Sequence, residues 1–396
     1  TPRTSSAASD VYKRQTGDTL FLEEEHIILK EQIKKFVETE VKPVALKWES
    51  DGFIPREVFK KMGALGFLGI TYPTEFGGSE MDVRGSVVFA EELGKSTFSG
   101  FAIASLVHTD MASVHLLNAG NVEQKEKYLS DIVSGSKISC VAVTEPHAGS
   151  DVKNIRTKAQ KVGNKYLING SKIFITNGVH ADIYFVAAKT SADSQQSGNI
   201  TMFIVRKDNP GLIVNKQLDK HGWKCSDTAE LFFQDCEVEK ADVLGTLHKG
   251  FYAIMQNFQN ERLVMGSMAM GEAQAAIDTT VDYVKQRDAF GGKLWEKQTV
   301  RHKLAEIQSK VTAARYMVYG VANKVRLGID VIKEVSMIKV LCGELVNEVM
   351  YTCLQLHGGT GYMTGTEIER LTRDARAQSI GGGATEVMLE EVAKRM

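Results

Sequence analysis

Two segments in the middle of the chain place polar side chains and turns at the ends of β-type runs. Residues 140–151 begin with apolar residues, break at a proline and continue as a small polar loop through Gly149 and Ser150. Such a turn exposes backbone N–H groups and a hydroxyl at the end of a strand. Residues 168–178 read as a turn, a strand that ends in Thr176, and a second turn. We expect the two segments to hold a large ligand with polar edges.

Three segments nearer the C-terminus carry residue types that could bind an anion or move a proton. Arg287 follows a helical pattern and could bind a diphosphate, although a solvated helix end explains an isolated arginine more simply. Residues 355–362 are rich in glycine, but the helical pattern before them does not fit a Rossmann loop. Glu261 lies in a charged helical stretch, where most carboxylates are simply solvated.

The two strand–turn segments together resemble the flavin-binding signature of the acyl-CoA dehydrogenase family. The family wording is close to Thr-Glu-x-x-Ala-Gly-Ser-Asp, and residues 144–151 match it. Asn154 departs from the small residue usual in the family, and Phe174 stands where many members carry a tryptophan. An ordinary strand–turn–strand would explain the segments in isolation. The sequence Ser-Asp-Thr-Ala-Glu-Leu-Phe-Phe at 226–233 and turns in the N-terminal part add further matches.

The resemblance implies FAD as the cofactor and assigns residues to it. Thr144 and Thr176 would hydrogen-bond the flavin ring, Phe174 would pack on its face, and Arg287 would meet the diphosphate of a neighbouring subunit's cofactor. The residues expected at the cofactor are Val141, Val143, Thr144, Gly149, Ser150, Phe174, Ile175, Thr176, Arg287, Phe290, Gln298, Gln355, Gly358, Gly359, Ala384, Thr385 and Glu386. Because some of these would reach a neighbour, the resemblance implies a homo-oligomer, commonly a tetramer. No metal is expected.

The expected catalytic base is displaced from its commonest position in the family. Most members read close to Tyr-Glu-Gly-Thr near the C-terminus, and that glutamate is the base, whereas Gly382 occupies its place here. Glu386, four residues on, falls at the start of a helix and more plausibly supports that N-terminus. Isovaleryl- and long-chain enzymes carry the base in a Glu-Arg-Leu sequence, which Glu261 matches. The pairing of Gly382 with Glu261 therefore favours Glu261 as the base.

The implied reaction is α,β-dehydrogenation of an acyl-CoA thioester to the trans-2-enoyl-CoA. Glu261 would remove the α-proton, and flavin N5 would take the β-hydride. Gly382 keeps the backbone N–H that would stabilise the enolate oxygen, and burial of the carboxylate by the acyl chain would raise the pKa of Glu261. The residues expected at the substrate are Ser150, Tyr252, Asn260, Arg262, Gly382 and Gly383.

Substrate and electron acceptor follow less directly from the resemblance. Some segments resemble long-chain enzymes and others citronellyl-CoA dehydrogenases, so a long or branched acyl chain is expected. Small residues at 99–105 would suit a deep pocket. An electron-transfer flavoprotein is the expected acceptor. The alternatives are an acyl-CoA oxidase, which returns electrons to O₂, and an inert flavin- or acyl-CoA-binding homologue.

Length and composition bound the remaining possibilities. A chain of 396 residues with 43% hydrophobic residues can bury a large core, and a net charge of −1 does not favour nucleic acid or an anionic membrane. The five cysteines are scattered without metal-type spacing, which favours a reducing compartment. No apolar run approaches the roughly 18 residues needed to cross a bilayer. We expect a cytoplasmic protein if bacterial, and one of the mitochondrial matrix if eukaryotic.

The hydrophobic periodicity predicts the elements that position these residues. It is helical from residue 20, changes to period two near residue 137, and becomes helical again from residue 250. The expected fold is mainly α with a central β domain: a helical N-terminal domain, an antiparallel β-barrel or sandwich, and a C-terminal four-helix bundle, as in acyl-CoA dehydrogenases. The expected bounds are 1–15 for a disordered tail or sequence artefact, then 16–137, 138–247 and 248–396 for the three domains.

Overall fold

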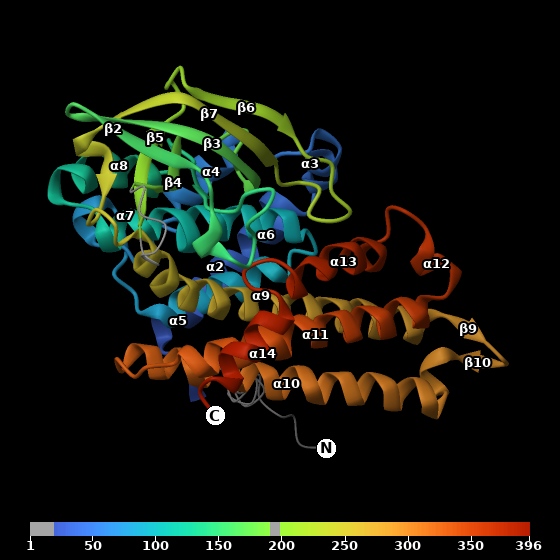
Figure 1. Ribbon diagram of the computed structural model, residues 1–396. Helices are drawn as coiled ribbons and strands as arrows, with labels where there is room; N and C mark the ends of the chain where they lie inside the picture. The colour runs from blue at the N-terminus through green and yellow to red at the C-terminus, as the bar shows by residue number, and fades with distance from the viewer. Residues whose placement is uncertain (1–19, 191–198) are drawn as a thin grey trace.

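The computed structural model describes residues 20–190 and 199–396, so the expectation for the N-terminal tail lies outside this part. Helices come first, an eight-stranded sheet follows, and long helices complete the chain (Figure 1). The α-helices of the first part are α2 (Glu24–Phe36), α3 (Ala45–Asp51), α4 (Arg56–Ala64), α5 (Val83–Gly94), α6 (Ser99–Leu106), α7 (Ser113–Ala119) and α8 (Val122–Val133). The order helix, sheet, helix confirms the predicted fold class.

Helices α5 and α8 begin where the sequence supplies capping side chains. The Asp82 carboxylate accepts a hydrogen bond from the backbone N–H of Arg84, and Asn121 forms a reciprocal capping box with Gln124. Between α6 and α7 the chain remains helical through a π-helical segment, η4 (Val107–Ala112). A π-helix changes which carbonyls are paired, and such segments are frequent at functional sites.

The stretch from α6 to α7 is as long and apolar as a membrane span. This differs from the prediction that no such run exists, because Ser99–Ala119 has a mean hydropathy of 1.2. However, 89% of that window is buried inside the protein, as expected for the core helix of a folded domain.

The sheet is open and mixed rather than a closed barrel. Its strands are β1 (Ser139–Ala142), β2 (Lys158–Val162), β3 (Lys165–Thr176), β4 (Ile183–Lys189), β5 (Ile200–Arg206), β6 (Leu212–Gln217), β7 (Thr228–Glu239) and β8 (Val243–Leu244). They are hydrogen-bonded in the order β6-β7-β3-β2-β4-β5-β8, with β1 beside β4. Strands β1 and β2 run parallel to β4, and the other pairs are antiparallel.

The long strand β3 corrects the sequence analysis, which began a strand only after a turn within residues 168–178. The sequence Asn169-Gly170-Ser171 was expected to be a turn, but it lies inside β3, where Gly170 has a φ of 152°. The pairing of β3 with β7 shifts register between Ile168 and Gly170, which is a β-bulge. Ile168 pairs with Cys236 and Gly170 with Phe233, so the extra residue lies in β7, opposite Asn169 and Gly170. In the sequence alone, the pair Asn-Gly resembles a hairpin turn.

Both faces of the sheet are buried at β4, which is why this strand is apolar at consecutive positions. Ile183, Phe185 and Ala187 join the large core that the sheet shares with the helices. Tyr184 and Val186 point to the other face and pack in a second, smaller core within the β part. Alternation of side chains along a strand divides one apolar run between the two cores.

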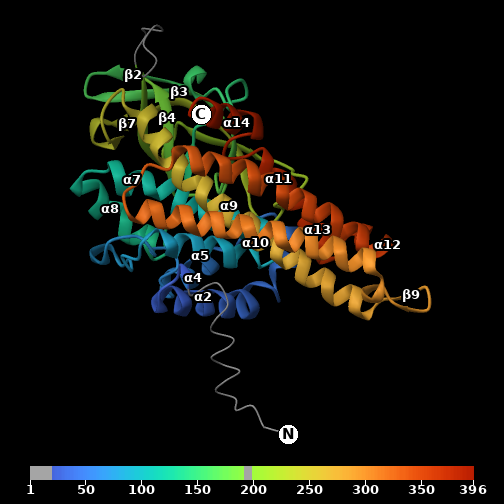
Figure 2. The same cartoon turned by 90° about the horizontal axis from the view of Figure 1, so that it is seen from below.

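The C-terminal part is a bundle whose longest member crosses the middle of the molecule. Its helices are α9 (Gly250–Gln286), α10 (Gln298–Arg326), α11 (Ile332–His357), α12 (Gly359–Tyr362), α13 (Glu367–Ala375) and α14 (Thr385–Ala393). Helix α9 packs against α5, α10 and α11, so it joins the bundle to the N-terminal helices. Figure 2 shows α9, α10 and α11 side by side, with a short hairpin, β9 (Asp288–Ala289) and β10 (Gly292–Lys293), at their far end.

Candidate active site

A buried ion pair fixes the loop that follows β1. The carboxylate of Glu145 lies 2.8 Å from the Lys172 ammonium, and both side chains are at most 1% exposed. Glu145 also accepts hydrogen bonds from the backbone N–H groups of Arg156 and Thr157. Burial opposes ionisation of this carboxyl, but Lys172 and these hydrogen bonds hold its pKa below the usual value. The loop is therefore anchored at both ends of residues 145–157.

The same loop brings its first hydroxyl next to the end of β3. The backbone N–H of Ile173 donates to the carbonyl oxygen of Thr144 at 3.0 Å, so Thr144 lies beside the strand that ends in Thr176. Phe174, between them, has a φ of 62° and its side chain is 65% exposed. A bulky residue rarely adopts positive φ, and such strained positions cluster at functional sites. Thr144 and the exposed ring of Phe174 thus lie at the end of β3 that carries Thr176.

The other residues predicted at the cofactor near Thr144 differ in which of their groups could contact a ligand. The side chain of Ile175 is buried in the core of the β part, so only its backbone can face a ligand. Gly149 and Ser150 are exposed on the loop, and a Cβ at Gly149 would meet no atom within 4 Å. His147, to which no role was assigned, places Nε2 3.3 Å from the Glu145 carboxylate.

Glu261 is a buried carboxyl in the middle of α9. The residue is only 7% exposed. The Asn257 amide donates a hydrogen bond of 2.8 Å to Glu261 Oε1. Burial raises the pKa of Glu261 to about 8, against the opposing influences of Asn257 and Arg262. A base whose pKa lies near the working pH is partly deprotonated and still has a high affinity for the proton it must take. This burial contradicts the alternative that Glu261 is a solvated surface carboxylate.

The π-helical segment η4 holds the amides that surround Glu261. The Asn257 amide also donates to the carbonyl of Met111 at 3.1 Å, and the Asn260 amide donates to the carbonyl of Asp110 at 3.2 Å. Asn257 therefore bridges η4 and the Glu261 carboxyl. Sequence analysis missed Asn257, although its position four residues before Glu261 places both on one face of a helix.

Gly382, in the C-terminal segment, lies against α9 at a point one helical turn after Glu261. A Cβ built on Gly382 would stand 2.3 Å from Met265 Sδ, and Met265 is four residues after Glu261. Gly382 also has a φ of 65°, which disfavours any side chain. Within the described residues its backbone N–H has no hydrogen-bond partner, and the residue is exposed. The C-terminal segment thus presents a free N–H beside the helix that carries the carboxyl.

Two buried cationic side chains, Arg262 and Lys339, lie close to Glu261 and Gly382. Arg262 is 8% exposed, its Nη1 lies 3.4 Å from Ser336 Oγ, and its Nε has no partner among the described residues. Lys339 is 3% exposed, and its ammonium donates to the carbonyl of Gln378, four residues before Gly382. Burial and, to a smaller extent, the charge of Arg262 lower the pKa of Lys339 to about 8. Lys339 was not singled out from the sequence, because nothing in its spacing marks it.

The remaining residues expected at the substrate have different surroundings. Asn260 contacts η4, as described above, whereas Tyr252 is 60% exposed with the Lys249 ammonium 5.4 Å from its ring centre. Nine residues separate Tyr252 from Glu261, about two and a half turns, so their side chains leave α9 in nearly opposite directions. Gly383 follows Gly382 with a φ of 111°.

A second group of expected cofactor residues lies at the far end of the bundle. Figure 1 shows β9, β10 and α12 together at this end, away from the sheet. Phe290 and Gly291 form a two-residue hairpin turn with φ of 54° and 79°, and Phe290 is 91% exposed. Positive φ at both positions is typical of a type I′ turn. The other members of the group are exposed as well: Arg287, Gln298, Gln355, Gly358 and Gly359. One chain therefore does not bring this group to Thr144.

Similarity to known proteins agrees with this architecture. Family models described as the N-terminal, middle and C-terminal domains of acyl-CoA dehydrogenase match residues 23–136, 140–236 and 248–396. The mouse mitochondrial long-chain specific acyl-CoA dehydrogenase is 38% identical over 94% of this chain and 86% of its own length. The chain belongs to the acyl-CoA dehydrogenase family. It is an oxidoreductase by that membership.

Two further relatives of the family agree in length and fold. The mitochondrial isovaleryl-CoA dehydrogenase of Pongo abelii is 37% identical over 92% of this chain and 87% of its own length. A crystal structure of acyl-CoA dehydrogenase from Geobacillus kaustophilus has a TM-score of 0.90 and 40% identity, covering 95% of this chain and 98% of that one.

Members of the acyl-CoA dehydrogenase family are FAD flavoproteins, and the residues present fit such a cofactor. Phe174 offers an exposed aromatic face beside Thr144 and Thr176. At Gly358 and Gly359 a Cβ would meet no atom within 4 Å, so the backbone there is open to close approach. Ala384 caps α14, and Thr385 and Glu386 open it, where the first N–H groups of a helix favour an anion.

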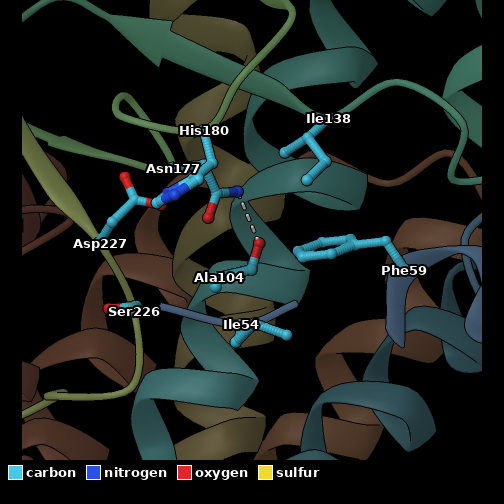
Figure 3. A pocket seen from close by; sticks show the side chains of 8 residues that line it. All are labelled: Ile54, Phe59, Ala104, Ile138, Asn177, His180, Ser226 and Asp227. Atoms are coloured by element: carbon cyan, nitrogen blue, oxygen red, sulfur yellow. Dashed lines mark hydrogen bonds and ion pairs between the residues drawn. The ribbon is translucent and has the colours of Figure 1, made fainter. Parts of the chain in front are cut away.

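A small cavity elsewhere is not the acyl-CoA site of this family member. Figure 3 shows it between the N-terminal helices and the sheet, where the Asn177 amide donates to the carbonyl of Ala104 at 2.9 Å. It measures about 10 Å³ and is lined by Ile54, Phe59, Ala104, Ile138, Asn177, His180, Ser226 and Asp227. That is about the volume needed for one water molecule, far below what a thioester requires.

Proposed function

We propose that this protein catalyses the FAD-dependent α,β-dehydrogenation of an acyl-CoA thioester to the trans-2-enoyl-CoA. The observation that carries the proposal is the pairing of a buried carboxyl, Glu261, with the unpaired N–H of Gly382 one helical turn away. These are the two groups that abstraction of a proton next to a thioester needs: a base and a donor for the oxygen that becomes negative.

Glu261 acts as the base in its ionised form. Its pKa of about 8 leaves it largely protonated at neutral pH, and the hydrogen bond from Asn257 favours the carboxylate that must take the α-proton. Burial makes that carboxylate a stronger base than a solvated one. The Gly382 N–H donates to the thioester oxygen, and Arg262 and Lys339 add positive charge near the developing enolate.

The FAD, when bound, supplies the acceptor for the β-hydride. Thr144 and Thr176 hold its ring edge, Phe174 covers its face, and Ser150 lies on the exposed loop beside it. The remaining contacts on this side would come from Val141, Val143, Gly149, Ile175, Ala384, Thr385 and Glu386.

A homo-oligomer would complete the cofactor site. Arg287 and the turn at Gln355–Gly359 lie at the far end of the bundle, so they could meet only a neighbour's cofactor. The exposed Phe290 at the hairpin tip supports contact with another copy, since a fully exposed aromatic ring at a strained position is costly in water. We propose a tetramer, with an electron-transfer flavoprotein as the acceptor.

Anaerobic titration of the purified protein with straight and branched acyl-CoA esters tests the reaction. Bleaching of flavin absorbance supports the dehydrogenase, and oxygen consumption on mixing in air would favour an oxidase instead. No bleaching with any ester would favour an inert binding protein. A long or branched acyl chain is expected to give the fastest bleaching.

A further inference from the structure

The segment at residues 375–382 lies against one face of α11. It contains the short 3₁₀ helix η8 (Arg376–Ser379) and ends at Gly382, so we call it the η8 segment. On α11, residues at steps of four share one face of the helix. Three residues of α11 follow one another at this spacing, and each of them contacts the η8 segment: Lys339, Gly343 and Asn347.

Two of these residues fix the first half of the η8 segment. The Asn347 amide donates to the carbonyl of Ala375 at 3.1 Å, and the Ser379 hydroxyl donates to the carbonyl of Gly343 at 2.8 Å. A Cβ built on Gly343 would stand only 2.9 Å from the carbonyl oxygen of Gln378. The lack of a side chain at Gly343 therefore allows the η8 segment to approach α11 this closely.

Lys339 contacts both ends of the turn that leads to Gly382. Its ammonium donates a hydrogen bond to the carbonyl of Gln378. Its Cε would lie 3.6 Å from a Cβ built on Gly382, so the stem of the lysine packs beside that glycine. Lys339 is only 3% exposed. Because a buried ammonium is costly without hydrogen bonds, its bond to Gln378 is a strong restraint on the turn.

The turn itself leaves one N–H for a ligand. The backbone N–H groups of Ile380 and Gly381 both donate to the carbonyl of Ala377, at 3.0 and 2.9 Å. The next N–H, that of Gly382, has no partner within the described residues. The direction of this N–H therefore depends on the turn that Lys339 holds at Gln378.

We propose that Lys339 is a positioning residue that aims the N–H of Gly382 at the thioester oxygen. It acts through the carbonyl of Gln378 and through its contact with Gly382, without touching the substrate. This inference rests on the proposed function, because it takes the Gly382 N–H as the donor to the developing enolate. Such a donor stabilises the transition state only at a short, fixed distance, so a small shift of the turn slows the reaction.

Lys339→Met tests the restraint, because methionine matches the lysine stem but has no donor. Anaerobic flavin reduction at saturating acyl-CoA should slow by at least about tenfold, whereas bound FAD and the dissociation constant of the ester should change by less than about threefold. Lys310→Met is the matched control, since Lys310 forms an exposed ion pair with Glu348 of α11, and its rate should stay within about twofold of the parent rate. Reduction by Lys339→Met at the parent rate would overturn the proposal.

Gly343→Ala separates the position of the turn from the charge of the lysine. This variant keeps Lys339, but its Cβ must displace the carbonyl of Gln378. We expect reduction to slow by at least about threefold, even though alanine favours the helix. Reduction by Gly343→Ala at the parent rate, beside a slow Lys339→Met, would mean that the lysine acts by charge alone and would overturn the positioning role. If Lys339→Met fails to bind FAD, Gly343→Ala decides.

Amide hydrogen exchange reports the position of the turn without the reaction. In Lys339→Met the N–H groups of Ile380 and Gly381 should exchange at least about fivefold faster, with little change elsewhere. Equal exchange, or an increase spread evenly over the chain, would contradict the restraint.

Exchange and flavin reduction also separate this inference from the proposed reaction. Faster exchange in Lys339→Met, beside a parent protein that no ester reduces, supports the restraint and contradicts the dehydrogenase. Equal exchange beside an active parent protein supports the dehydrogenase and contradicts the role of Lys339.

Discussion

The Asn257 amide donates a hydrogen bond of 2.8 Å to Glu261 and one of 3.1 Å to the carbonyl of Met111. A single side chain thus ties the carboxyl on α9 to the π-helical segment of the neighbouring helix. Because the amide donates to Glu261, it favours the ionised carboxylate and opposes the effect of burial. Asn257 is therefore a positioning residue that also sets the pH at which the base becomes available.

Replacing Asn257 by alanine should shift the pH dependence of the reaction. Loss of the hydrogen bond raises the pKa of Glu261 further, so the rise of kcat/KM with pH should move upward by about one unit. The measurement is kcat/KM for one acyl-CoA ester from pH 6 to pH 10. Asn260→Ala is the matched control, because Asn260 also donates to η4 but not to Glu261. An equal shift in both variants would contradict this role.

Gly382 should not tolerate even a small side chain without loss of stability. Alanine there would adopt a φ near 65° and approach Met265 Sδ, which together should cost about 1–2 kcal/mol of unfolding free energy. Chemical denaturation measures this cost, and the additional change Met265→Ala should recover only the part due to the contact. Gly320→Ala is the control: it lies inside α10 with no atom within 4 Å of a Cβ, and should be neutral or stabilising.

The buried pair of Glu145 and Lys172 should be more important to stability than an exposed pair on the same strand. Lys172→Met leaves a buried carboxylate without its cation and should lower the unfolding free energy by about 3 kcal/mol, with loss of bound FAD. Lys165→Met removes the exposed partner of Glu237 and should cost less than about 1 kcal/mol. Equal losses in denaturant titrations would show that the loop does not depend on this pair.

Because the pKa of Glu261 is raised in the folded protein, the free energy of unfolding should decrease as the pH rises. The folded state holds the proton up to a pH of about 8, whereas the unfolded carboxyl releases it near 4.5. Stability from this residue is therefore greatest below pH 4.5 and is lost as the pH rises toward 8. Glu261→Gln removes this dependence.

Thermal unfolding of Glu261→Gln and of the parent protein measures that effect. The variant should have a similar Tm near pH 5 and a higher one at pH 8.5, where the gain is at most roughly 5 kcal/mol. Glu306→Gln, at an exposed position on α10, should change Tm at neither pH. A pH-independent difference for Glu261→Gln would mean that the carboxyl is ionised in the folded protein throughout.

Much of the fold could be predicted from the sequence because most helices and strands have a clear hydrophobic period. The helical period from residue 250 onward predicted the region of the long helices α9, α10 and α11. The long strand β3 was divided because an irregularly paired strand and a turn can contain the same residue types. The sheet is open because of how strands distant in sequence pair, and a local sequence pattern cannot predict that pairing.

The candidate site divides in the same way. Glu261, Thr144 and Gly382 were singled out because they lie in recognisable motifs. Asn257 and Lys339 were missed because their significance comes from burial and from partners distant in sequence, such as Met111 and Gln378. A polar residue on an apolar helix face is a weak signal until the packing around it is known.

Anaerobic flavin reduction by Glu261→Gln tests the central claim most directly. With FAD and acyl-CoA binding retained, we predict that the rate of flavin reduction falls by at least about 10³-fold, because Gly382, at the position where most of the family carries the base, has no side chain to take the proton. Reduction by Glu261→Gln at the rate of the parent protein would contradict the assignment of Glu261 as the base.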